Sequence, residues 1–277
     1  MTGRTPGRAG KLVVALFAAL ACTAMAASVA SAGTIYSNIA KPLAGNFASI
    51  GNEAYSNSEL GSLVQFASTK RNATSVTVGM SSWACQEGGV FSDDCKSAKK
   101  ATFAWPVRLN IYNVGPENSV GSLVASSEKT FSMPYRPTVN SVMCTGESAG
   151  GWYDKKDATC FHGKGFRITF PLEGVTLPNQ AIISVQYNTS DHGPAPVGEA
   201  PCRTSASGCF YDSLNVALIE AVENTHPIGS NPDPNELFAN TQYNEIDCGS
   251  SENLGTFGPT GACWEGQQVA LAVKATK

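Results

Sequence analysis

The chain has 277 residues, of which 19 are Lys or Arg and 22 are Asp or Glu, so only 15% of its side chains are charged. An average soluble domain has roughly 25% charged residues, and disordered or nucleic-acid-binding chains usually have more. With 42% hydrophobic residues and a formal net charge of −3, the composition favours a folded domain with a sizeable core. It gives no reason to expect nucleic acid or an anionic membrane as a partner.

The first 32 residues have the three parts of a secretory signal peptide. Basic residues come first, the uncharged apolar stretch Leu12–Ala30 follows, and small residues at Ala30 and Ala32 precede Gly33. We expect cleavage before Gly33, so that residues 33–277 are secreted with no transmembrane anchor. The alternatives are an uncleaved anchor and a lipid attached at Cys22.

Eight cysteines follow this segment, and an even number in an exported chain predicts disulfides. We expect each cysteine to pair with its nearest neighbour in sequence, because each such pair brackets a polar, turn-rich segment. The expected pairs are Cys85–Cys95, Cys144–Cys160, Cys202–Cys209 and Cys248–Cys263. No C-x-x-C is present and the three histidines lie far from ligand spacing, so we predict no metal and no cofactor.

Apolar and polar residues alternate along most of the chain, which is typical of half-buried strands. In Phe103–Asn113 the apolar side chains share one face, and Arg108, Asn110 and Tyr112 share the other. Comparable runs predict further strands at Gly33–Ile39, Gly61–Ser68, Val76–Ser81, Ser122–Phe131, Phe166–Leu172, Ile183–Tyr187, Leu214–Leu218 and Val269–Val273. The segments between these runs are turn-rich loops, and none of them has the pattern of a long amphipathic helix. We therefore predict an all-β fold, a single antiparallel β-sandwich that is jelly-roll-like and disulfide-stabilised, over residues 33–277.

The run LNIYNVGPENSVGSLVAS, residues Leu109–Ser126, resembles a hairpin of exported bacterial jelly-roll proteins. There, a strand ending in IY is followed by a Gly-rich turn and a GxLLAS strand. Phe166–Asn188 and the closing strand are similar to the same group of uncharacterised exported bacterial β-sandwich proteins. The resemblance implies the fold and export, and it carries no catalytic residues.

One short motif suggests chemistry. Gly146-Glu147-Ser148-Ala149-Gly150 matches the G-x-S-x-G pattern of esterase nucleophiles. That chemistry needs the serine between a strand and a helix, with an oxyanion hole and a base. Here a loop leading to Cys160 follows, and the nearest histidine, His162, precedes a Gly-rich turn. We therefore predict that Ser148 fits a turn and is not a nucleophile.

A second pattern could bind calcium. Asn231, Asp233 and Asn235 alternate with prolines, which would aim three side-chain oxygens in similar directions. The remaining ligands that calcium requires are not identifiable, so a proline-stiffened loop is the favoured interpretation.

Loop aromatics provide the candidate binding residues. Trp152, Tyr153 and Trp264 lie in cysteine-bounded loops, and rigid aromatic rings stack on sugars or on protein partners. The alternative is that these rings cap the sandwich over their own disulfides. We predict a secreted, non-catalytic β-sandwich that binds an extracellular or cell-wall ligand, with polysaccharide as the leading class. The alternatives are a secreted polysaccharide hydrolase or lyase, an esterase with Ser148 as nucleophile, and a structural envelope component.

Overall fold

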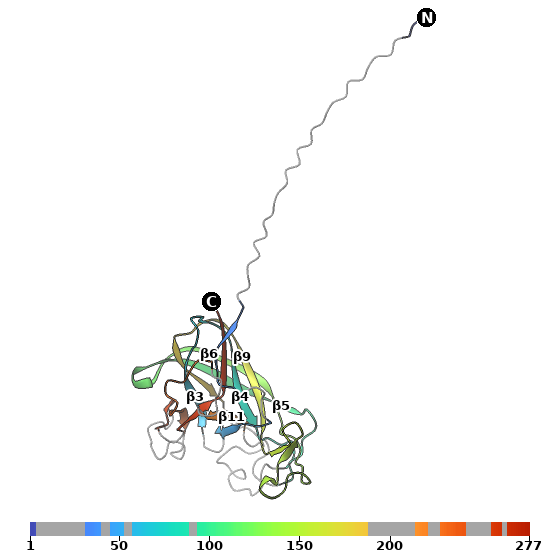
Figure 1. The fold of residues 1–277 in the computed structure, drawn as a ribbon, viewed down its shortest axis with the longest axis vertical. Helices are drawn as coiled ribbons and strands as arrows, with labels where there is room; N and C mark the ends of the chain where they lie inside the picture. Colours follow the sequence, from blue (N-terminus) through green and yellow to red (C-terminus); the bar gives the residue numbers. More distant parts are fainter. Residues whose placement is uncertain are drawn as a thin grey trace. The chain divides into compact units, whose positions relative to one another are not determined.

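Antiparallel β-strands form nearly all of the regular structure of the chain (Figure 1). The computed structural model describes residues 1–3, 31–39, 45–52, 57–88, 93–187, 214–220, 228–241, 256–261 and 265–277. Ser31–Lys277 forms one compact unit, and all the strands in the described ranges belong to it. Within the described ranges, no helix combines the length and the apolar character needed to cross a membrane.

The first of two large sheets has seven strands. They are β1 (Gly33–Ser37), β2 (Ala48–Gly51), β4 (Asn72–Ser82), β9 (Lys164–Thr176), β11 (Leu214–Glu220), β14 (Gln267–Val269) and β15 (Leu271–Thr276). The central strand is β4, which pairs along its whole length with β9. The opposite edge of β4 is divided between β15 and β11.

The second large sheet has six strands, in the order β13-β12-β3-β10-β5-β6. They are β3 (Asn57–Gln65), β5 (Thr102–Val114), β6 (Val120–Pro134), β10 (Gln180–Gln186), β12 (Phe238–Thr241) and β13 (Gly258–Pro259). A single-turn helix, η1 (Pro116–Asn118), joins β5 and β6 into a long hairpin. Because β10 lies between β3 and β5, residues from distant parts of the chain meet on this sheet.

A small separate hairpin follows the long one in the chain. It consists of β7 (Trp152–Asp154) and β8 (Thr159–Phe161), and it is preceded by the single-turn helix η2 (Gly146–Ser148). The sequence pattern did not predict these two strands as strands, since each is only three residues long.

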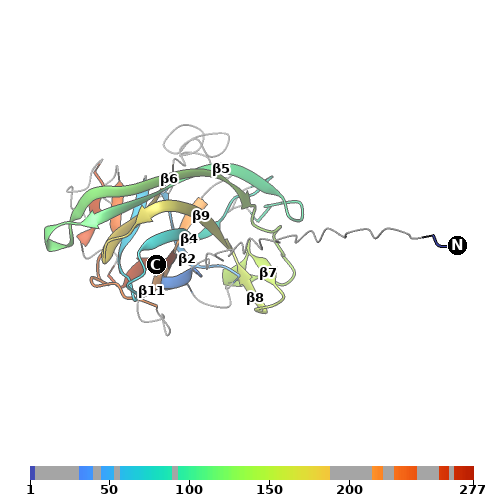
Figure 2. The ribbon, with the colours of Figure 1, turned by 90° about the horizontal axis from the view of Figure 1, so that it is seen from above.

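One apolar core lies between the two large sheets. Phe131 of β6 meets Phe170 of β9 edge to face, with 4.8 Å between the ring centroids. A polar contact also joins the sheets, since the Val269 backbone N–H donates to the Ser62 hydroxyl at 2.8 Å. Figure 2 shows β5 and β6 in one layer above β4, β9 and β11 in the other. The predicted all-β antiparallel class is confirmed, and jelly-roll connectivity stays a prediction.

Two of the four predicted disulfides are present. Cys85 is joined to Cys95, and Cys144 to Cys160, with Cα–Cα distances of 5.5 and 5.8 Å. The other two predicted pairs, Cys202–Cys209 and Cys248–Cys263, lie outside the described residues, as does most of the predicted signal segment. The confirmed pairs show that thiol oxidation belongs to this fold, which fits an oxidising compartment.

Candidate functional site

Of the two aromatic residues predicted to bind a ligand in the small hairpin, Trp152 is buried. Trp152 is only 6% exposed, and its indole N–H donates to the Gly163 carbonyl oxygen at 2.8 Å. Its ring packs beside Phe161, and the Lys164 ammonium lies 4.7 Å from the ring centre. The half-buried Tyr153 pairs in register with Cys160. Trp152 therefore fits the structural alternative, a ring that caps its own disulfide loop.

The third aromatic residue of the prediction, Trp264, lies outside the described residues. Because Trp152 is buried, Trp152 and Tyr153 together form no exposed stacking platform.

Ser148 lies at the end of a tight turn, η2, which Gly146 enters with a positive φ of 62°. The nearest histidine in sequence, His162, directs Nε2 to the Ala149 carbonyl oxygen at 2.9 Å. A carbonyl oxygen only accepts hydrogen bonds, so Nε2 is the donor in this contact. The imidazole also stacks on Trp83, with 6.1 Å between ring centroids. The prediction that Ser148 is not a nucleophile awaits an activity measurement.

In the loop with alternating prolines, side-chain oxygens accept hydrogen bonds from other residues of the protein. Asn231 Oδ1 accepts the Asp233 backbone N–H, and Asp233 Oδ2 accepts the Asn118 side-chain amide, both at 3.0 Å. Among the described residues, no group of three or more His, Cys, Asp or Glu side chains is arranged to hold a metal ion. These contacts match the favoured interpretation of a stiffened loop.

A fully buried cation lies beside the two disulfide loops. The Arg136 backbone N–H donates to Ala84, and its guanidinium donates to the Gly150 carbonyl oxygen. Burial lowers the pKa of Arg136 to about 10, and the negative charge of Asp93 acts in the opposite direction. Arg136 therefore ties together the segments that follow Trp83 and Ser148, and it is not accessible to a ligand.

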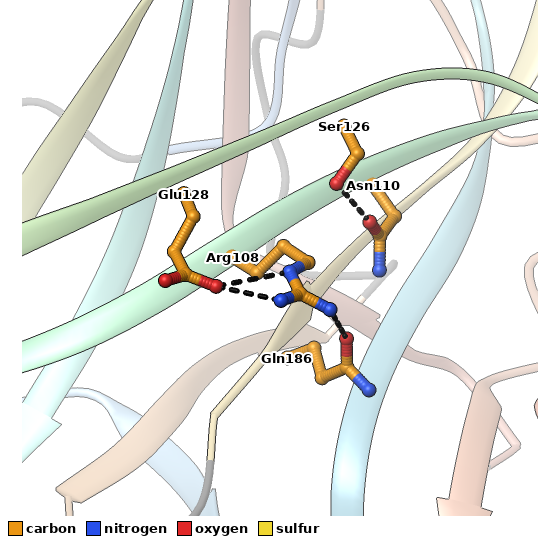
Figure 3. Close-up of polar contacts among 5 residues, drawn as sticks. All are labelled: Arg108, Asn110, Ser126, Glu128 and Gln186. Atoms are coloured by element: carbon orange, nitrogen blue, oxygen red, sulfur yellow. Dashed lines mark hydrogen bonds and ion pairs between the residues drawn. The ribbon is translucent and has the colours of Figure 1, made fainter.

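Polar side chains gather on the outer face of the six-stranded sheet, the face opposite the core (Figure 3). We call this set the outer polar face: Glu59, Arg108, Asn110, Tyr112, Ser126, Glu128, Ser184 and Gln186. They come from four adjacent strands, β3, β10, β5 and β6. Strand alternation selects this face, because the intervening residues point into the core.

Exposure varies over this face, and it increases along the register row that runs from Glu59 on β3 to Glu128 on β6. Glu59 on β3 is 3% exposed and Asn110 on β5 is 5% exposed. The Arg108 and Glu128 side chains are 48% and 56% exposed. The face thus has a buried half, which is fixed by the fold, and an open half that solvent or a ligand can reach.

The buried half is organised around one carboxylate oxygen. Glu59 Oε1 accepts hydrogen bonds from Asn110 Nδ2 at 2.9 Å, the Tyr112 hydroxyl at 3.0 Å and the Ser184 hydroxyl at 2.5 Å. Burial, and then the negative charge of Glu59, raise the pKa of Tyr112 above its usual value. Tyr112 therefore remains a hydrogen-bond donor at physiological pH. Asn110 in turn accepts the exposed Ser126 hydroxyl at 2.8 Å, which connects the buried half to the surface.

The open half is centred on Arg108. Its Nε and Nη2 both donate to Glu128 Oε2, at 3.1 and 2.7 Å, and Nη1 donates to Gln186 Oε1 at 3.4 Å. Exposed ion pairs of this kind contribute about 0–1 kcal/mol to stability. Since these three side chains hold an ordered arrangement that stability hardly requires, they are suited to recognition.

An apolar cluster borders the polar set on the same face. Leu63, Ile182 and Phe238 form its buried part, and Phe257 and Tyr112 pack against it. The Phe257 ring lies 5.4 Å from the Tyr112 ring. Gly61 makes room for this ring, since a Cβ there would lie 3.0 Å from Phe257 and 2.8 Å from Ser184.

The segment that carries Phe257 is held by Glu236. Its Oε1 accepts the backbone N–H groups of Thr260, at 2.6 Å, and Gly261, at 2.8 Å. Burial raises the pKa of Glu236, while these hydrogen bonds and the Thr260 hydroxyl act to lower it. Glu236 is thus a positioning residue for the apolar border of the face.

The two glutamates of the outer polar face stand on strands that are not neighbours. Glu59, Gln186, Arg108 and Glu128 follow one another in register across four strands. Three strand spacings separate the backbones of the two glutamates by roughly 14 Å. The arrangement can form several hydrogen bonds to a hydroxyl-rich ligand.

No family model matches the chain, and neither the curated proteins nor the solved structures contain a significant match. The resemblance of Leu109–Ser126 to exported jelly-roll proteins therefore stays a prediction. The outer polar face itself was missed by sequence reasoning, although the alternation in Phe103–Asn113 already placed Arg108, Asn110 and Tyr112 together.

Proposed function

We propose that the chain is a secreted, non-catalytic β-sandwich that binds an extracellular or cell-wall polysaccharide through its outer polar face. The signal-like segment before Gly33 and the two disulfides support export. The polysaccharide class was the leading expectation from the sequence, and the proposed contact surface is now the sheet face instead of the loop around Trp152.

The observation that carries the proposal is the exposed arrangement of Arg108, Glu128 and Gln186 beside Ser126. Sugar hydroxyls both donate and accept hydrogen bonds, so they are bound by adjacent donors and acceptors with fixed directions. The guanidinium and carboxylate form stronger hydrogen bonds than neutral groups do. Because all four side chains stand on paired strands, binding costs little conformational entropy.

Binding should be measured with the purified mature protein on a glycan array, followed by affinity electrophoresis in soluble polysaccharides. We expect Arg108→Ala to weaken the binding of the selected polysaccharide at least tenfold. The matched control is Arg167→Ala on β9 of the other sheet, which should bind as the wild type does.

Two results would overturn the proposal. One is a wild-type protein that binds no polysaccharide on the array or in a cell-wall pull-down. The other is Arg108→Ala binding with wild-type affinity while the fold is intact. Release of reducing sugars or ester hydrolysis in the same samples would instead support the enzymatic alternatives.

A further inference from the structure

We infer that the outer polar face selects uncharged polysaccharides and discriminates against polyuronates and sulfated glycans. This inference rests on the proposed function and adds the substrate class. The starting point is the charge of the face, on which the guanidinium of Arg108 stands with two carboxylates, Glu59 and Glu128. Acidic groups are therefore in excess over the whole face, and at its open half Glu128 balances the charge of Arg108.

Glu128 already neutralises Arg108 as an anion site. Two of the Arg108 nitrogens donate to Glu128 Oε2, and a third donates to Gln186. An anionic sugar that accepted from the remaining guanidinium N–H groups would lie next to the Glu128 carboxylate. Like charges brought together in this way disfavour binding, most strongly at low ionic strength.

The same pair is well arranged for neutral hydroxyls. Glu128 directs only Oε2 to Arg108, so Oε1 is left to accept a hydroxyl hydrogen (Figure 3). The guanidinium edge and the Gln186 carboxamide provide donors on the adjacent strands. Two neighbouring hydroxyl groups of a sugar ring could therefore be bound at once, one donating to Glu128 and the other accepting from Arg108.

Glu128 is accordingly the specificity-determining residue. Its role is to neutralise Arg108 and to repel anionic sugars, while it accepts a hydrogen bond from a neutral one. Replacement by glutamine keeps the size and one acceptor oxygen but removes the charge. The guanidinium would then carry a net positive charge at the open half of the face.

The test compares wild type, Glu128→Gln and a matched control, Glu173→Gln, which removes the same charge from the exposed side of β9 in the other sheet. Dissociation constants should be measured in 50 and 200 mM NaCl, chosen as roughly low and physiological ionic strength. The probes are a soluble neutral β-glucan, a neutral mannan, polygalacturonate and a sulfated glycan.

We expect the wild type and Glu173→Gln to bind at least one neutral glycan, and to bind polygalacturonate at least tenfold more weakly. Glu128→Gln should lose about tenfold affinity for the neutral glycan and gain about tenfold for polygalacturonate, with the gain reduced in 200 mM NaCl. Thermal unfolding of each variant verifies that the fold is retained.

Wild-type binding to polygalacturonate that equals or exceeds binding to the neutral glycans would overturn the inference and leave the proposed function intact. A folded Glu128→Gln variant with unchanged selectivity would also overturn it. If no polysaccharide binds to any variant, the proposed function itself fails, and the inference fails with it.

Discussion

The small β7–β8 hairpin and the outer face of the six-stranded sheet use binding-type residues in opposite ways. In the hairpin, Trp152 donates its indole N–H to Gly163 and has its ring covered by Phe161 and Lys164. On the sheet face, Arg108 and Glu128 are about half exposed and are held in position mainly by each other. The aromatic loop serves its own packing, whereas the sheet presents its polar groups.

The two regions also differ in what fixes their geometry. A disulfide between Cys144 and Cys160 closes the segment that carries Trp152. On the sheet face, backbone pairing and the buried Glu59 cluster position the side chains. The small hairpin, which has no large core of its own, is therefore closed by a disulfide, whereas the sheet face, which is suited to recognition, is held by hydrogen-bonded strands.

The largest effect expected from a single substitution is at Glu59. Glu59→Ala would leave the donors of Asn110, Tyr112 and Ser184 buried without their acceptor, which should destabilise the fold by about 3–5 kcal/mol. Denaturant unfolding followed by tryptophan fluorescence measures this loss. Glu59→Gln is the control, because its remaining oxygen can accept the same hydrogen bonds, and it should lose less than half as much. A Glu59→Ala variant as stable as wild type would show that the cluster does not organise the face.

Removal of the hairpin disulfide should cause the second-largest loss of stability. The double variant Cys144→Ala/Cys160→Ala opens a loop with a sequence separation of 16 residues. The loop-entropy model then predicts a loss of about 3 kcal/mol. Binding of the selected polysaccharide at 20 °C, about room temperature, should stay within twofold of wild type, because the disulfide lies apart from the sheet that carries Arg108. Loss of binding in a folded double variant would mean that the hairpin belongs to the site.

A milder substitution at the Trp152 ring tests the same difference between the hairpin and the sheet face. Trp152→Phe removes the donor to the Gly163 carbonyl oxygen and some buried volume, and should cost about 1–2 kcal/mol. Glycan affinity should be unchanged, because a ring that is 6% exposed does not contact a ligand. A tenfold loss of affinity with an intact fold would return the binding role to the hairpin.

Much of the fold followed from alternation. The run Phe103–Asn113 predicted the strand that is observed as β5, and pairing of nearest-neighbour cysteines predicted Cys85–Cys95 and Cys144–Cys160. These features depend on residues close together in the chain, which is why a single sequence reveals them.

The candidate site could not be assembled in the same way. Glu59 and Ser184 lie 125 residues apart in sequence, yet a hydrogen bond joins them because β10 pairs with β3. Alternation assigned Arg108 and Asn110 to one face, but it contains no information on which strands stand beside β5. The register with Gln186 and Glu128 was needed before the polar set became recognisable.

The smallest expected effect concerns Glu236, which holds the Phe257 segment through Thr260 and Gly261. Burial raises its pKa above the ordinary 4.5, so the folded state binds this proton more tightly than the unfolded state does. The contribution of Glu236 to stability is therefore greatest below pH 4.5 and falls as the pH rises through the raised pKa.

Glu236→Gln keeps an acceptor and does not titrate. The melting temperature of this variant minus that of wild type should thus be higher at neutral pH than near the ordinary carboxyl pKa, by roughly 1–2 °C. Scanning calorimetry across this range measures the difference, and a difference that stays flat or falls with pH would contradict the assigned burial of the Glu236 carboxylate.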